Sequence, residues 1–253
     1  MKLFLDLNSY IDTSKGHDIS IPLSNNDHNP LAWYLSHPIF EIVRSEGYVG
    51  AVAEGGSVNF RTITFNPHGH GTHTECLGHI TNEVFSINQH LKESFFMAEL
   101  ISVQPSIKEN KAFGGYDHVI TKEQLQNALS GKEVKAVVLR TTPNSVSKKQ
   151  LNYTNTNPPY LDVDCISVLD DLGVEHFLID LPSVDREIDG GKLAFHHSFW
   201  GVPNDLKFHK TITEFIYVPD HIKDGVYLLN LQTAPFENDA TPSRPVLFSI
   251  LSE

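Results

Sequence analysis

Two short runs with an apolar centre constrain the fold of this chain more than any other feature of its sequence. They cover residues 135–140 and 176–180, and runs with so few polar side chains are typical of central strands buried on both faces. Residues 162–172 between them have the pattern of a helix that ends at Gly173. Strand, helix and strand in this order predict an α/β domain.

Further strands and helices are predicted around this unit. Residues 2–11 have the pattern of a short strand or arm, and 99–103 and 246–251 that of strands. A helix is expected to begin at Thr121 as its N-cap and to stop at Gly131. Because no tract resembles a linker, we expect a single domain over residues 1–253.

Three segments near the predicted site are assigned from turn signals. Residues 49–54 and 58–65 alternate or are β-branched, and the Gly55-Gly56 pair between them predicts a hairpin. Pro30 favours the start of a helix over 31–35. The polar, proline-containing residues 141–159 are expected to form a loop that covers the site.

The candidate site begins with twelve residues that hold four histidines and one carboxylate: His68-Gly-His70-Gly-Thr-His73-Thr-Glu75-Cys-Leu-Gly-His79. Imidazole nitrogen and carboxylate oxygen together suit divalent ions such as Zn, Mn or Fe. This segment therefore predicts a metal site.

The order of residues in this segment suggests different roles for its members. If the chain is extended from residue 72 onward, His73, Glu75 and His79 share one face. The preceding glycines allow a sharp turn that brings either His68 or His70 in as a third ligand. Since His79 lies farther along that face, it suits proton transfer beside the metal better than metal ligation.

The same segment, as Gly71-Thr72-His73-x-Glu75-x-x-x-His79, resembles the signature of the cyclase family of metal-dependent hydrolases. That family includes the kynurenine formamidase and isatin hydrolase types, and its usual motif is His-x-Gly-Thr-His-x-Asp-x-Pro-x-His. Here Gly69 stands at the first histidine, Glu75 replaces the aspartate and Leu77 replaces the proline. His68 or His70 must therefore supply the first ligand, and the longer Glu75 side chain bears on where the metal lies.

Later segments are similar to other elements of this family, in the same order along the chain. Those with chemistry to offer are Asp180-Leu-Pro-Ser183-Val-Asp185, His196-His197-Ser-Phe-Trp200, Thr213-Glu214 and Asp239-Ala-Thr-Pro242-Ser-Arg244. The resemblance implies that His196 is a metal ligand or proton relay and that Glu214 faces the metal or its water. Asp180 and Asp185 are expected to orient a neighbouring histidine or backbone group, and Arg244 to clamp a carboxylate.

Together these observations predict one site and one kind of chemistry. One or two Zn or Mn ions are expected, with His79 as the catalytic base and five ligands: His68, His73, Glu75, His196 and Glu214. The expected reaction is hydrolysis of an amide, formamide, lactam or lactone by a metal-activated water. The resemblance also implies a mixed central β-sheet of the swivelling β/β/α type flanked by helices, a small-molecule substrate, and a homo-oligomer, most simply a dimer.

Alternative functions use some of the same residues. Cys76 could act as a nucleophile with His79, but in an extended strand the two side chains point to opposite faces. Ser183 lacks the Gly-x-Ser-x-Gly turn of a serine nucleophile. A non-catalytic metal- or small-ligand-binding protein that retains the fold is the alternative from a different class. Three aromatic residues would serve either a substrate pocket or the core: Trp33, Tyr34 and Trp200.

Composition excludes other classes of function. The formal net charge of −12 and the lack of a Lys/Arg-rich run argue against a nucleic-acid partner. No stretch has the apolar length of a membrane span, and the first residues lack that of a signal peptide. With only Cys76 and Cys165, a disulfide framework is excluded and a cytoplasmic location is expected.

Overall fold

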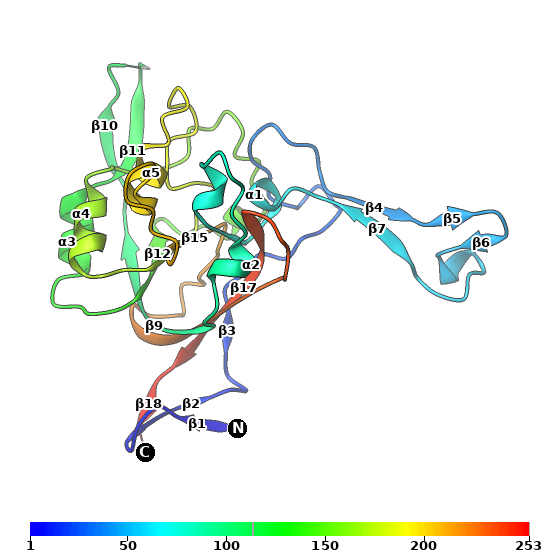
Figure 1. Cartoon of the computed structure of the whole chain (residues 1–253), viewed down its shortest axis with the longest axis horizontal. Coiled ribbons are helices and arrows are strands. Elements are labelled where there is room, and N and C mark those ends of the chain that lie inside the picture. Colours follow the sequence, from blue (N-terminus) through cyan, green and yellow to red (C-terminus); the bar gives the residue numbers. More distant parts are fainter. Residues whose placement is uncertain (113, 253) are drawn as a thin grey trace.

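The computed structural model describes residues 1–112 and 114–252 and is built around one mixed β-sheet (Figure 1). Within the described residues this sheet has eight strands in the order β16-β9-β12-β14-β15-β8-β17-β3, and a further β16–β17 pairing closes it. Strands β9, β12, β14 and β15 run parallel to their neighbours in that group, whereas the remaining pairs are antiparallel. The predicted mixed sheet of an α/β fold is therefore confirmed. The strands are β3 (His17–Asp18), β8 (His73–Glu75), β9 (Phe95–Val103), β12 (Ala136–Thr141), β14 (His176–Ile179), β15 (Thr211–Glu214), β16 (Gly225–Thr233) and β17 (Ala240–Ser249).

The two apolar runs form the centre of the sheet as predicted. Every residue of β12 and β14 is buried, because alternate side chains enter two different hydrophobic clusters. Val137 and Leu139 pack with the helices, whereas Ala136 and Val138 pack with side chains of β9, β16 and β17. Burial on both faces explains why residues 136–139 and 177–179 are all apolar.

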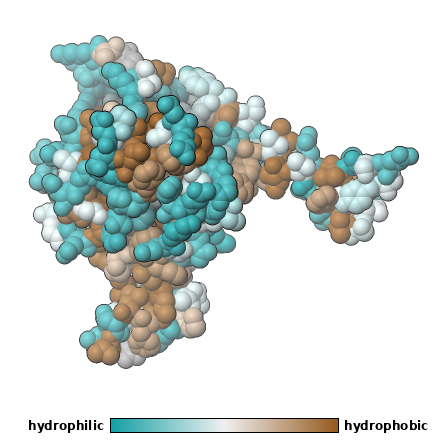
Figure 2. Space-filling model, in the orientation of Figure 1, coloured by the Kyte–Doolittle hydropathy of each residue, from teal (hydrophilic) through white to brown (hydrophobic). Residues whose placement is uncertain are grey.

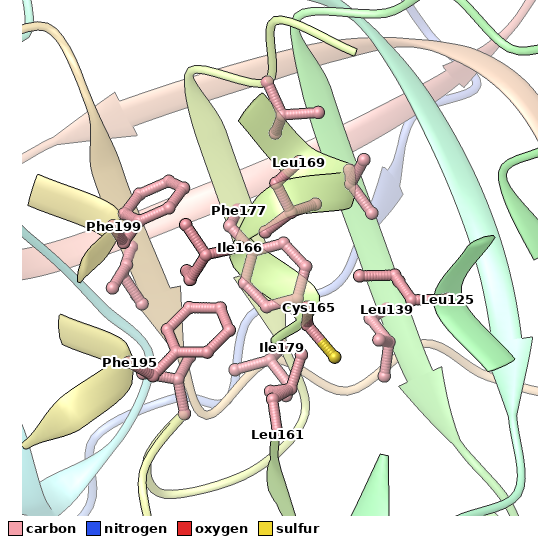
Figure 3. Packing of buried hydrophobic residues seen from close by; sticks show 14 of the residues in the cluster. Leu125, Leu139, Leu161, Cys165, Ile166, Leu169, Phe177, Ile179, Phe195 and Phe199 are labelled. Carbon is pink, nitrogen blue, oxygen red and sulfur yellow. The ribbon is translucent and has the colours of Figure 1, made fainter. Parts of the chain in front are cut away.

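Three helices cover one face of the sheet: α3 (Lys122–Ala128), α4 (Cys165–Asp171) and α5 (Ala194–Trp200). Figure 3 shows Leu125, Leu169 and Phe195 from these helices packing against Phe177 and Leu139 of the strands. The Thr121 hydroxyl accepts from the Gln124 backbone N–H at 3.3 Å, and the Gln124 side chain accepts from the Thr121 N–H at 3.0 Å. This capping box fixes the start of α3 where the sequence predicts it.

Two strand-rich segments project from this body (Figure 1). One is a small antiparallel sheet of β1 (Lys2–Phe4), β2 (Ser9–Asp12) and β18 (Leu251–Ser252), which contains the strand or arm predicted for residues 2–11. It exposes Leu3 and Phe4, and Figure 2 shows hydrophobic residues gathered there. The other is an arm in which β4 (Ile39–Ile42) pairs with β7 (Arg61–Thr64), and β5 (Arg44–Ser45) with β6 (Tyr48–Val49).

The hairpin predicted for residues 49–54 and 58–65 is wrong. Residues Val52–Glu54 form the short 3₁₀ turn η1, and Gly55 ends it with φ +90°, so the glycine pair closes that turn and does not join two paired strands. The partner of β7 is instead β4, with Ile39 opposite Thr64.

The helix predicted over 31–35 is also absent from this described segment. Its backbone donors are used elsewhere, since Ala32 N–H donates to the Gly69 carbonyl at 3.1 Å and Leu31 N–H to the Leu151 carbonyl at 3.0 Å. Trp33 and Tyr34 have φ values of 61° and 60°, which a right-handed helix does not allow.

The remaining elements are short. They are β10 (Ser106–Glu109), β11 (Tyr116–Ile120), β13 (Tyr160–Leu161), α1 (Pro67–His70), η2 (Leu77–His79), α2 (Ile87–His90) and η3 (Val146–Gln150). Among the described residues, no helix combines the length and the hydrophobicity needed to cross a membrane.

Candidate metal centre

The structure brings all six predicted site residues together, although they come from separate elements. Antiparallel pairing places Glu214 of β15 directly opposite His73 of β8, and parallel pairing aligns β15 with the buried strand β14. The site therefore lies where the central sheet joins the histidine-rich segment. Its members are His68 on α1, His73 and Glu75 on β8, His79 on η2, His196 on α5 and Glu214 on β15.

Glu75 lies at the middle of this group. Its Oε2 is 3.0 Å from His68 Nδ1 and 3.9 Å from His73 Nε2, and its Oε1 is 3.0 Å from His196 Nε2. His73 Nε2 is also 3.5 Å from Glu214 Oε2. Donor atoms around one tetrahedral ion with bonds of about 2.1 Å lie about 3.4 Å apart, so this spacing suits a shared cation.

Three of the histidines are held through their other ring nitrogen. His73 Nδ1 lies 3.0 Å from the Gly71 carbonyl oxygen, His196 Nδ1 lies 2.6 Å from Asp185 Oδ2, and His68 Nε2 lies 2.8 Å from Asp239 Oδ2. Each ring is therefore oriented so that its remaining nitrogen faces Glu75 or Glu214. Metal-binding histidines characteristically have this arrangement.

Three buried ligand atoms in the cluster have no hydrogen-bond partner among the described residues, as expected of atoms that bind a metal ion. They are His68 Nδ1, His73 Nε2 and Glu75 Oε2. Buried polar atoms are rarely left unpaired, and here all three point toward one another. Two sets of ligand atoms each lie within 4.8 Å: His68, Glu75 and His79, and His73, Glu75 and Glu214. Because Glu75 belongs to both sets, the residues fit one ion or two bridged by this carboxylate.

The charges in the cluster are strongly coupled. Burial would raise the pKa of Glu75, but the electrostatic interaction with His79 and the contacts with His196 and His68 hold it well below its usual value. Burial disfavours the charged form of His68, yet Asp239 and Glu75 outweigh burial and raise its pKa to about 10. The pKa of His196 likewise reaches about 10, because Asp185 and Glu75 outweigh burial. The carboxylates thus stabilise positive charge at the position a cation would take.

Of the two histidines that could supply the first ligand, His68 faces the cluster, at 3.0 Å from Glu75 Oε2, and His70 does not. His70 Nδ1 accepts from the Asn66 backbone N–H, and His70 Nε2 lies 2.8 Å from the Ser36 carbonyl oxygen, so its ring is engaged outside the cluster. Gly69 permits this arrangement, because a Cβ there would lie 2.4 Å from Leu35 Cδ1.

The extended conformation expected through His79 is wrong. Strand β8 ends at Glu75, and residues 77–79 form the 3₁₀ turn η2. A Cβ on Gly78 would lie 2.2 Å from the Phe85 carbonyl oxygen, so glycine is needed for this tight approach. His79 therefore reaches the site through a turn. Cys76 Sγ donates to the Phe85 carbonyl oxygen, and burial raises its pKa to about 11, which argues against a thiolate nucleophile.

The supporting carboxylates play different parts. Asp185 orients His196, as predicted. Asp180 instead accepts from Thr141 N–H and from Lys148 Nζ at 2.8 Å, so it holds backbone and contacts no site histidine in the described structure. Asp239 is a site residue that sequence reasoning misses. The motif Asp-x-x-Pro-x-Arg points to its segment but gives a role only to Arg244, and Arg244 does clamp a carboxylate, that of Asp18, at 2.7 Å.

A pocket of about 720 Å³ opens onto the cluster. Its lining includes Trp33, Tyr34 and Leu35, residues 186–191 and Leu193, together with His68, His79, His196 and Glu214 of the cluster. Trp200 is fully buried in the core. Residues 142–159 are irregular apart from η3, but none of the described residues lining the pocket comes from 141–159, so the prediction that this loop covers the site is wrong. That segment supports the pocket lining instead, since Thr154 Oγ1 accepts from the Tyr34 N–H.

Comparison with known proteins agrees with this geometry. The Cyclase family model matches residues 17–186. A kynurenine formamidase from a strain of Bacillus cereus is 30% identical over 238 residues, covering 93% of this chain and 98% of that protein. A crystal structure described as a novel cyclase matches with a TM-score of 0.66 at 14% identity, over 94% of this chain and 90% of that one. An isatin hydrolase bound to the product analogue thioisatinate matches with a TM-score of 0.63 at 13% identity, over 94% and 93%.

Proposed function

As a member of the cyclase family, this chain is a metal-dependent hydrolase, and we propose that it cleaves an amide-type carbon–nitrogen bond in a small molecule. The observation that carries the proposal is the convergence of three buried, unpartnered ligand atoms on one point beside a pocket: His68 Nδ1, His73 Nε2 and Glu75 Oε2. Histidine nitrogen with carboxylate oxygen favours Zn or Mn among common divalent ions.

We propose that five residues hold the metal and one moves protons. The ligands are His68, His73, Glu75, His196 and Glu214, either around one ion or around two with Glu75 between them. A divalent cation in this position supplies Lewis acidity toward a carbonyl oxygen and toward water.

His79 is suited to proton transfer because it is the most accessible member of the cluster. Its side chain is 30% exposed, whereas those of His73, Glu75, His196 and Glu214 are at most 4% exposed. It lines the pocket, so it can take a proton from the attacking water and return it to the leaving nitrogen.

The walls of the pocket favour a substrate with a flat apolar group next to the scissile bond. Trp33 and Tyr34 contribute aromatic surface to the lining, and Ile188 and Leu193 contribute aliphatic surface. Aryl formamides and lactams fit this description, as the kynurenine formamidase and isatin hydrolase relatives suggest. Lactones share the same carbonyl chemistry and belong in the same test.

We further propose a homodimer. The arm of β4 and β7 exposes Ile39, Phe60 and Ile63 to about half of their full extent, and a two-stranded ribbon is marginally stable by itself. A second copy that covers these side chains would stabilise it. Light scattering on the purified protein distinguishes a dimer from a monomer.

The enzyme hypothesis is tested by metal content and turnover of matched variants. His73→Ala should lose both stoichiometric metal and activity on a panel of formamides, lactams and lactones. His209→Ala, at an exposed histidine outside the cluster, should keep both. Metal-independent turnover by the His73 variant would contradict the proposal. A protein that binds metal stoichiometrically but hydrolyses nothing on the panel would instead be a non-catalytic metal-binding member of the fold.

A further inference from the structure

One oxygen atom of Asp239 contacts two site histidines at once. Asp239 Oδ2 lies 2.8 Å from His68 Nε2 and 3.3 Å from His79 Nδ1. The two imidazole rings are stacked on each other, with centroids 4.2 Å apart and an interplanar angle of 27°. The same carboxylate therefore touches a proposed metal ligand and the proposed base.

The backbone holds Asp239 firmly in this position. It lies immediately before β17, where Ala240 pairs with Glu75 of β8, and its carbonyl accepts from the Cys76 N–H at 3.0 Å. Asp239 is thus fixed to the strand that carries Glu75. Its side chain is 14% exposed, and the two histidines lower the pKa of its carboxyl group even though burial opposes this.

We propose that Asp239 is a positioning residue that sets the tautomers of His68 and His79 together, an inference that rests on the proposed function. A carboxylate oxygen has two lone pairs and can accept both N–H groups. When His68 Nε2 donates to Asp239, its Nδ1 is left as the lone-pair atom facing Glu75. When His79 Nδ1 donates to the same oxygen, its Nε2 is left as the atom that takes up a proton.

This arrangement makes a prediction that a role in metal binding alone does not. Replacing the carboxylate by the neutral amide of asparagine, which is a weaker acceptor and also brings an NH₂ donor, should disturb the ligand and the base simultaneously. Asp185 offers the comparison, because it accepts from the His196 ring and from the Phe195 and His196 backbone N–H groups but not from His79. Changing Asp185 should weaken metal binding and leave the tautomer of His79 unchanged.

The experiment compares Asp239→Asn with Asp185→Asn and with Glu237→Gln, an exposed carboxylate on the same loop that binds Asn88 and Gln89. Zinc affinity is measured by competition titration with Zn²⁺ alone, and histidine tautomers by ¹H–¹⁵N NMR of the zinc-loaded proteins. Asp239→Asn should weaken Zn²⁺ binding about 10- to 100-fold and abolish the Nδ1–H tautomer of His79. Asp239→Glu should restore part of both, and Glu237→Gln should match the wild type.

Kinetics at saturating zinc separate the two roles. If Asp239 positions the base, kcat of Asp239→Asn should fall about 10-fold or more even when every site holds zinc, with KM little changed. An unchanged His79 tautomer with wild-type kcat at saturating zinc would refute the coupling while leaving the proposed hydrolase intact. The loss of one of two bound zinc ions in Asp239→Asn would show that Asp239 is a ligand, which also overturns the inference. Failure of the hydrolase itself would appear instead as metal-free turnover by His73→Ala.

Discussion

Replacing Lys148 by methionine should destabilise the protein by several kcal/mol, because it leaves a fully buried carboxylate without its cation. Asp180 is 2% exposed and accepts three kinds of donor: the Thr141 N–H, the Thr141 hydroxyl and Lys148 Nζ at 2.8 Å. Lys148 also donates to the Thr141 carbonyl oxygen. Breaking a buried ion pair from one side typically costs about 3–5 kcal/mol.

The pH dependence of this loss can be worked out from Asp180. Burial already raises the pKa of Asp180 above its ordinary value of 3.8, although Lys148 and Thr141 oppose this. Without Lys148 the carboxyl group can avoid the unpaired charge by taking up a proton. Protonating a carboxyl group with the ordinary pKa of 3.8 costs about 1.4 kcal/mol for each pH unit above that value. The cost is therefore about 4 kcal/mol at pH 7 and less than about 2 kcal/mol at pH 5. A raised folded-state pKa gives stability that is present at low pH and lost as pH rises, so the gap to wild type should widen from pH 5 to pH 7.

Urea denaturation at pH 5 and pH 7 of wild type, Lys148→Met and Lys148→Met/Asp180→Asn measures the effect. The double variant keeps an acceptor for Thr141 but carries no charge, so its deficit should be smaller at pH 7 and nearly independent of pH. A deficit of less than about 1 kcal/mol for Lys148→Met at pH 7, or one that does not change with pH, would refute the reasoning.

Two further substitutions test other parts of the structure. His176→Asn should make the free energy of unfolding fall less steeply as the pH is lowered. Burial lowers the pKa of His176 to about 4, so the folded state favours the neutral ring. The stability that depends on this neutral ring is present above pH 6.5 and is lost, by about 3 kcal/mol in total, as the pH falls toward 4. Urea denaturation at pH 7 and pH 4.5 measures this, and an unchanged slope would contradict it. Gly69→Ala should destabilise the protein by about 1–3 kcal/mol and weaken Zn²⁺ binding, because its Cβ would lie 2.4 Å from Leu35 Cδ1 and 3.2 Å from the Ala32 carbonyl oxygen. Adding Leu35→Ala should recover stability, and wild-type stability of Gly69→Ala alone would show that the contact is not tight.

The centre of the fold is predictable because its signals are local. An apolar run on a doubly buried strand is visible in a few consecutive residues, as 136–139 of β12 show. The cap of α3 is visible in Thr121 and Gln124 alone. The predictions for segments 31–35 and 49–65 are wrong because their partners are distant. Residue 32 donates to Gly69, and β7 pairs with β4 and not with the residues just before its turn.

The same distinction applies to the site. His68, His73, Glu75 and His79 are recognisable because they occur within twelve residues. Asp239 is 171 residues from His68, and its place beside His68 depends on the register of β8 with β17, in which Ala240 lies opposite Glu75. No local sequence pattern encodes that register. Asp239 can therefore be noticed in the sequence, but its contact with His68 cannot be predicted from it.

The two ligand positions at which this chain departs from the usual family motif meet at one contact. Gly69 occupies the position of the first histidine, and a side chain there would crowd Leu35 and the Ala32 carbonyl oxygen. The imidazole that faces the cluster from this segment is that of His68, one residue earlier on α1. Its Nδ1 lies 3.0 Å from Oε2 of Glu75, the residue whose side chain is one methylene longer than the usual aspartate. Because the earlier histidine and the longer carboxylate face each other, we propose that the two changes compensate, so that both side chains can hold the same ion despite the altered spacing.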